Sequence, residues 1–118
     1  MDRAKIGLFD DQKTIRDALR DGLEDAGHSI ELEADTLAAA RDEIAMLDPS
    51  TLDVAVVDGN LTKRDISGSD GAEITALLHG LGGITVIGFS ASAPVEGADH
   101  NVFKDEGITP ILDIISGL

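Results

Sequence analysis

The chain has 118 residues, of which 42% are hydrophobic and 3% aromatic, and its formal net charge is -14. This length suits one domain with one core, so we expect a single domain over residues 1–118 with no room for an output domain. The negative charge repels nucleic acid and anionic membrane surfaces, and the scarcity of aromatic rings leaves little for bases to stack on.

The composition also bears on the compartment. The sequence contains no cysteine, which excludes disulfides and thiolate metal sites. No apolar run reaches the roughly 20 residues of a membrane span, and no secretory signal is visible. These features predict a cytoplasmic protein. Its acidity is typical of a solvated surface, with a salty cytoplasm or a basic partner as sharper alternatives.

The first third of the chain predicts two strand–helix units. Residues 4–9 form an apolar run typical of a buried strand, and residues 12–26 carry apolar side chains at helical spacing up to Gly27, which can end a helix. Residues 29–33 alternate between polar and apolar, as in a strand near a sheet edge. Thr36 can cap a helix with an apolar face, which Pro49 would stop.

The middle of the chain predicts a central strand, a loop and a helix. Residues 54–57 read Val-Ala-Val-Val and favour a strand buried on both faces. A polar loop follows over residues 59–70. Asp70 with Glu73 resembles a capping box at the start of the next helix. Residues 84–89 are again an apolar strand.

The segment between Ser90 and Lys104 is too short to hold both a full crossover helix and the strand that should follow it. A crossover with its helix needs at least about 10–12 residues, and here a weak strand at 101–103 must also fit. Pro94 and Gly97 disfavour a helix in this segment. We therefore expect the fourth helix of the alternating pattern to be reduced to a turn or replaced by a loop. Thr109-Pro110 then predicts a capped C-terminal helix.

Strands and helices alternate, which predicts an α/β fold with a parallel sheet covered on both faces. In such sheets ligands bind beyond the carboxyl ends of the strands. The residues at those ends are chemically distinctive, namely Asp10, Asp11, Asp58, Ser90 and Lys104. Clustered carboxylates repel one another unless a cation joins them, and Mg²⁺ suits oxygen ligands with open water positions. Lys104 can balance the remaining charge and pair with a phosphoryl oxygen.

Each of these residues also has an ordinary explanation. Asp10 and Asp11 can cap the first helix, and Asp58 can begin a turn. Ser90 can be a loop hydroxyl and Lys104 a surface charge. Their coincidence at strand ends favours the functional interpretation.

The set resembles the receiver domain of two-component response regulators, over nearly the whole chain. The matching segments are residues 5–11, 56–60, 70–71, 88–91 and 97–99, continuing to 103–104. The resemblance implies a doubly wound, flavodoxin-like or CheY-like five-stranded parallel sheet in the order 2-1-3-4-5. It also implies a signalling phosphoacceptor rather than a classical enzyme.

The resemblance assigns roles to individual residues. Asp58 would attack a phosphohistidine, and Mg²⁺ would be held by Asp11 and Asp58 directly, by Asp10 through water and by the backbone carbonyl of Asn60. Positioning in line and charge neutralisation are what phosphoryl transfer needs.

Three further residues would complete this site. Ser90 would hydrogen-bond the phosphoryl group, Lys104 would pair first with the acceptor carboxylate and then with that group, and Ala91 would keep access open. Asn101 stands at the switch position, which is usually aromatic, so the usual coupling of hydroxyl and aromatic ring is not expected. Phe103 is a poor substitute, because its neighbour Lys104 points to the opposite face of a strand.

The expected function is that of a stand-alone response regulator. It would take a phosphoryl group from a histidine kinase or phosphotransfer protein and signal by contact with an unknown downstream protein; a homodimer is compatible with this. The loop at 59–70 is longer than usual, either as a tolerated insertion or as a lid or partner contact. The alternative is a pseudo-receiver, an interaction module that is not phosphorylated. An aspartyl-phosphate hydrolase would need a second domain to enclose its substrate.

Overall fold

The computed structural model describes residues 1–59, 69–91 and 93–118. Its strands and longer helices alternate along the chain up to β4, after which β5 is the next element: β1 (Lys5–Phe9), α1 (Lys13–Asp25), β2 (Ser29–Ala34), α2 (Leu37–Ala45), β3 (Val54–Val57), α3 (Ser69–Leu81), β4 (Thr85–Ser90), β5 (His100–Phe103) and α4 (Thr109–Ser116). Two short 3₁₀ helices, η1 (Pro49–Thr51) and η2 (Lys104–Glu106), lie between them. Most of the predicted loop at 59–70 lies outside the described residues.

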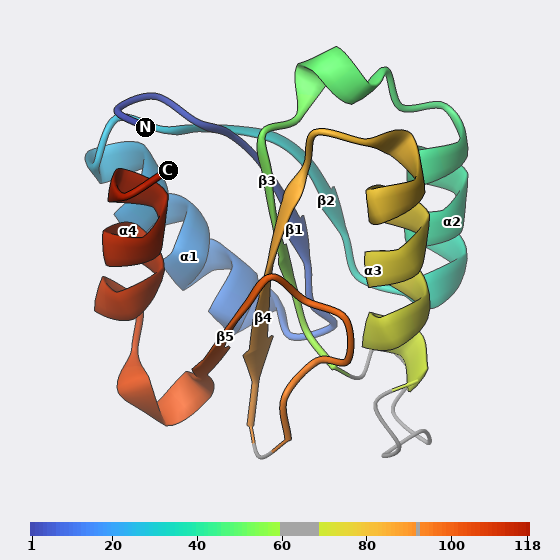
Figure 1. The fold of residues 1–118 in the computed structure, drawn as a ribbon. Coiled ribbons are helices and arrows are strands. Elements are labelled where there is room, and N and C mark those ends of the chain that lie inside the picture. Colours follow the sequence, from blue (N-terminus) through green and yellow to red (C-terminus); the bar gives the residue numbers. More distant parts are fainter. Residues whose placement is uncertain (60–68, 92) are drawn as a thin grey trace.

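The five strands form one parallel sheet in the order β2-β1-β3-β4-β5, which confirms the predicted α/β fold and strand order. Helices α1 and α4 cover one face and α2 and α3 cover the other (Figure 1). Every residue of β3 is buried, because this strand has neighbours on both sides and helices on both faces. Within the described residues, no helix has the length and apolar character to cross a bilayer.

Two hydrophobic cores result, one on each side of the sheet. Leu19 and Leu23 of α1 and Ile111 and Ile115 of α4 pack on one face. The other core lies under α2 and α3 and includes Val95 from the connection between β4 and β5. Strands β1, β3 and β4 each supply both cores through side chains on alternate faces, as the period of two requires.

The connection between β4 and β5 contains no helix in the part that the structure describes, residues 91 and 93–99, so the expected loss of the fourth helix is confirmed. Val95 is 2% exposed and packs into the core that lies under α2 and α3. The amide of Asn101 holds this segment, with Oδ1 accepting from the Val95 N–H at 2.8 Å. This loop therefore crosses the face of the sheet next to α3 (Figure 1).

Helix boundaries differ from the sequence prediction by a few residues. Thr36 does cap α2, its Oγ1 accepting from the Ala39 N–H. Asp70, however, lies inside the first turn of α3, which begins at Ser69. Thr109 is already helical, because Ile108 before it takes an α-region conformation as the N-cap. Helix α2 ends at Ala45, and Pro49 instead opens η1.

Candidate functional site

The two central strands end in carboxylates that lie side by side. Phe9 is paired with Val57 in the register of β1 and β3, so Asp10 and Asp58 leave adjacent strands at the same edge. The Asp58 N–H donates to the carbonyl of Phe9 at 2.8 Å, which extends this pairing by one residue. Asp11 follows directly. One carboxylate oxygen from each aspartate lies within 4.8 Å of the others, and we call these three residues the acidic cluster.

Lys104 reaches the acidic cluster from the first residue of η2, directly after β5. Its Nζ lies 3.1 Å from Oδ2 of Asp10 and 3.3 Å from Oδ2 of Asp58. The lysine side chain is 15% exposed, and those of Asp10 and Asp58 are 3% and 9% exposed. The ammonium is thus shared between two buried carboxylates, and the structure brings together the sequence-predicted Asp10, Asp11, Asp58 and Lys104.

Burial opposes the charge on Asp10. Loss of solvation raises the pKa of its carboxyl group above the ordinary value, although the Gln12 N–H and the ammonium of Lys104 partly counteract this. Oδ1 accepts the Gln12 N–H at 2.9 Å, but Gln12 is itself the N-cap of α1 and no side chain caps this helix, so the alternative interpretation of Asp10 and Asp11 as helix caps is wrong. A further positive charge at this site would favour the carboxylate form.

The donor set fits Mg²⁺. Three carboxylates and one ammonium leave two formal negative charges when all are ionised, which matches one divalent cation. Mg²⁺ takes oxygen ligands at about 2.0–2.1 Å and keeps several waters, so oxygens clustered as these are can bind directly or through water. Within the described residues these are the side chains that could hold such an ion.

Three of the remaining predicted site residues are described, and each has different surroundings. Ser90 ends β4, is 6% exposed, and donates its hydroxyl to the carbonyl of Ala93. Ala91 is exposed. Asn101 binds the main chain of Val95, so it anchors the loop between β4 and β5. Asn60 lies outside the described residues.

Two residues that contribute to the site had no role assigned from the sequence, although Gly71 lies in one of the segments that match receiver domains. Gly71 of α3 packs against the acceptor strand end, where its N–H donates to the Gly59 carbonyl at 3.0 Å. Arg16 of α1 donates from Nη1 to the carbonyl of Asp10 at 2.9 Å. The sequence did hold a signal for Arg16: this cation lies one turn into the helix that follows Asp10 and Asp11, and a possible acidic partner, Glu33, lies late in the next strand.

No family model matches this sequence, and no curated protein matches it either. Solved structures do match. A response regulator receiver domain protein (CheY-like) from Methanospirillum hungatei JF-1 is 24% identical with a TM-score of 0.77, covering 97% of this chain and 91% of its own. The chain has the receiver-domain fold.

Two further receiver structures agree. Response regulator TrrA from Thermotoga maritima, in complex with Mg²⁺ and BeF, is 20% identical with a TM-score of 0.75, covering 99% of this chain and 98% of its own. The receiver domain of the Francisella response regulator 1452 is 21% identical with a TM-score of 0.74, covering 96% and 93%. At these identities the likeness establishes the receiver fold, and the chemistry is argued from the side chains.

Proposed function

We propose that this protein is a stand-alone receiver that accepts a phosphoryl group on Asp58 in a Mg²⁺-dependent reaction and signals by protein contact. The observation that carries the proposal is Lys104, whose ammonium lies between the carboxylates of Asp10 and Asp58 beside a third carboxylate at the strand ends of a receiver fold. Repulsion between clustered carboxylates lowers the stability of the folded protein, and a module that only binds a partner gains nothing from such a cluster.

The chemistry follows from these side chains. A carboxylate oxygen of Asp58 attacks the phosphorus of a phosphohistidine, the phosphorus–nitrogen bond breaks, and the imidazole leaves with the bonding pair and takes a proton. An acyl phosphate remains on Asp58. Lys104 then pairs with a phosphoryl oxygen, and the Ser90 hydroxyl turns from the Ala93 carbonyl to donate to another phosphoryl oxygen. A bound Mg²⁺ would neutralise charge that develops on the transferred group.

The metal would be held by Asp11, Asp58 and the backbone carbonyl of Asn60, with Asp10 acting through water. Exposure of Ala91 next to Ser90 leaves this side of the acceptor open to a donor protein. Asp10 and Asp11 supply charge and orientation, while Asp58 alone forms a covalent bond.

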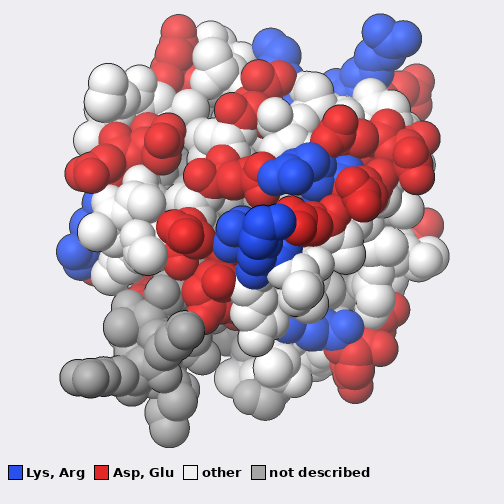
Figure 2. Space-filling view, turned by 180° about the vertical axis from the view of Figure 1, so that it is seen from behind, with Lys and Arg blue, Asp and Glu red and all other residues white. Residues whose placement is uncertain are grey.

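The partners follow from the same proposal. The donor is a histidine kinase or a histidine phosphotransfer protein, and the product is read by a downstream protein in the cytoplasm. Acidic side chains spread over most of the face in Figure 2, with Lys and Arg between them, which disfavours nucleic acid as the target. Because the connection between β4 and β5 contains no described helix, the target contacts a surface other than one built on that helix.

Acetyl phosphate with Mg²⁺ tests the proposal, with intact-mass measurement as the readout. Wild type should gain the mass of one phosphoryl group and Asp58→Asn should gain none. Asp53→Asn is the matched control, because Asp53 lies at the other end of β3, where its carboxylate accepts the Lys5 N–H. No gain on wild type, or an equal gain on Asp58→Asn, contradicts the proposal.

A pseudo-receiver is the second candidate, favoured by Asn101 at the switch position and by its use as a loop anchor. Calorimetric titration with Mg²⁺ separates the two functions. A wild-type site that binds no Mg²⁺ at millimolar concentration supports the pseudo-receiver.

A further inference from the structure

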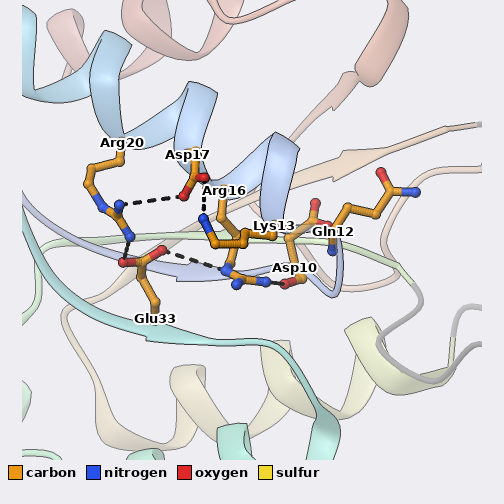
Figure 3. A network of polar contacts seen from close by, with 7 residues as sticks. All are labelled: Asp10, Gln12, Lys13, Arg16, Asp17, Arg20 and Glu33. Atoms are coloured by element: carbon orange, nitrogen blue, oxygen red, sulfur yellow. Dashed lines mark hydrogen bonds and ion pairs between the residues drawn. The ribbon is translucent and has the colours of Figure 1, made fainter.

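The Asp10–Asp11 peptide is held by a cation outside the acidic cluster. Arg16 Nη1 donates to the Asp10 carbonyl at 2.9 Å, from a side chain that is 15% exposed (Figure 3). This carbonyl belongs to the peptide plane that joins the two aspartates. The orientation of that plane therefore sets the direction in which the Asp11 side chain projects from the backbone.

Every other polar group of Asp10 is also occupied. Its N–H donates to the Ala34 carbonyl at 3.1 Å, Oδ1 accepts the Gln12 N–H at 2.9 Å, and Oδ2 lies 3.1 Å from Lys104 Nζ. The contacts from Ala34 and Gln12 orient the strand end and the helix entry. The contact from Arg16 orients the peptide between the two carboxylates.

Arg16 is itself held from the edge strand β2. Its Nε lies 3.6 Å from Oε1 of Glu33, an oxygen that is buried and has no hydrogen bond in the structure. The other oxygen of Glu33 binds Arg20, which also pairs with Asp17 (Figure 3). Glu33 thus fixes two arginines, only one of which touches the acidic cluster's backbone.

We infer that Arg16 is a positioning residue for the metal site: by binding the Asp10 carbonyl, it holds the carboxylates of Asp10 and Asp11 toward Asp58. This inference rests on the proposed function. The expected change in Mg²⁺ affinity is opposite in sign to the change expected from charge alone, because removal of a positive charge near a cation site should tighten Mg²⁺ binding. Loss of a positioning contact should weaken it, typically 10–100-fold for groups that orient metal ligands.

The test compares Mg²⁺ affinities of the full-length protein by calorimetry. Arg16→Met should weaken binding about tenfold or more. Arg20→Met also removes a positive charge that pairs with Glu33, but it leaves the bond to the Asp10 carbonyl in place. The Mg²⁺ affinity of this variant should therefore equal or exceed that of wild type. Arg16→Lys keeps the charge and can offer one donor, so it should recover part of the loss.

A backbone readout separates positioning from a general loss of stability. In amide NMR spectra without metal, Arg16→Met should shift the Asp11 and Gln12 signals, whereas Arg20→Met should leave them near their wild-type places. If Arg16→Met does not fold, Arg16→Lys decides: shifted Asp11 and Gln12 amide signals together with wild-type Mg²⁺ affinity in that variant overturn the inference.

The outcomes distinguish this inference from the function on which it rests. Wild type that binds Mg²⁺ while Arg16→Met binds as tightly as Arg20→Met overturns the inference alone. Wild type that binds no Mg²⁺ overturns the proposed function, and the inference with it.

Discussion

A methyl group added at Gly71 would collide with the backbone of the acceptor. An ideal Cβ at this position would lie 2.6 Å from the Asp58 carbonyl oxygen and 2.8 Å from the Gly59 Cα. Optimal non-bonded contacts between carbon atoms are about 3.5–4.0 Å, so backbone must move by several tenths of an ångström or more. No flexible side chain is available to give way, because both contacting atoms are backbone.

A second glycine of the same helix gives the magnitude. Gly80 also lies in α3, but an ideal Cβ there meets nothing within 4 Å. Alanine is favoured over glycine in a helix by roughly 0.5–1 kcal/mol, so Gly80→Ala should stabilise the protein by up to that amount. Gly71→Ala has the same gain offset by an overpacking cost of about 1–3 kcal/mol. The difference between the two variants therefore approximates the cost of the collision.

Thermal unfolding followed by circular dichroism measures this difference. At about 4 °C per kcal/mol for a domain of this size, Gly71→Ala should melt roughly 4–12 °C below Gly80→Ala. Mg²⁺ affinity should fall in Gly71→Ala, because the displaced atoms belong to Asp58, and remain at the wild-type value in Gly80→Ala. A Gly71→Ala protein that melts at or above Gly80→Ala would refute the reasoning.

Three other variants test local contacts. Thr36→Ala removes the cap of α2 and should lower the free energy of unfolding by about 1 kcal/mol in urea titrations, whereas Thr36→Ser should keep most of it. Asn101→Ala leaves the buried Val95 N–H without its acceptor and should cost about 1–3 kcal/mol by the same assay; no loss would show that the loop is held otherwise. Burial, aided by the N-terminal ammonium, lowers the pKa of His28 below 6.5, and its Nδ1 accepts the Ala4 N–H. The contribution of neutral His28 to the free energy of unfolding is therefore full above pH 6.5 and declines as the pH falls toward the lower folded pKa. Asn cannot titrate, so His28→Asn should be less stable than wild type above pH 6.5. The difference between their free energies of unfolding in urea should shrink as the pH falls below 6.5, and a difference that stays constant would contradict this.

The pattern of apolar residues was enough to predict the α/β class and the parallel sheet, whereas the strand order was implied by the resemblance to receiver domains. Runs such as Val54–Val57 alternate with helical periodicity, and a chain of strand–helix units can bury its apolar faces in few ways other than a parallel sheet between two helical layers. The loss of a helix between β4 and β5 was predictable for a similar reason, because chain length limits what fits between Ser90 and Lys104. Local chemistry also predicted the Thr36 cap, since this bond spans only three residues.

Helix starts at Ser69 and Thr109 were less predictable, because residues next to a cap can adopt helical backbone when tertiary packing favours it. The acidic cluster was predictable as a set, since parallel strands bring their carboxyl ends to one edge. How Lys104 divides its contacts between Asp10 and Asp58 depends on the lateral spacing of β1, β3 and β5.

The sequence by itself determined which residues meet at the sheet edge, because strand periodicity and chain order are local properties. Tertiary structure decided what holds them there. The bond from Arg16 to the Asp10 carbonyl, the contact of Gly71 with the acceptor backbone and the Asn101 anchor on Val95 join separate elements. Each depends on the distance and rotation between packed elements, which are set by the complementary shapes of side chains in the two cores and not by any pattern along the chain.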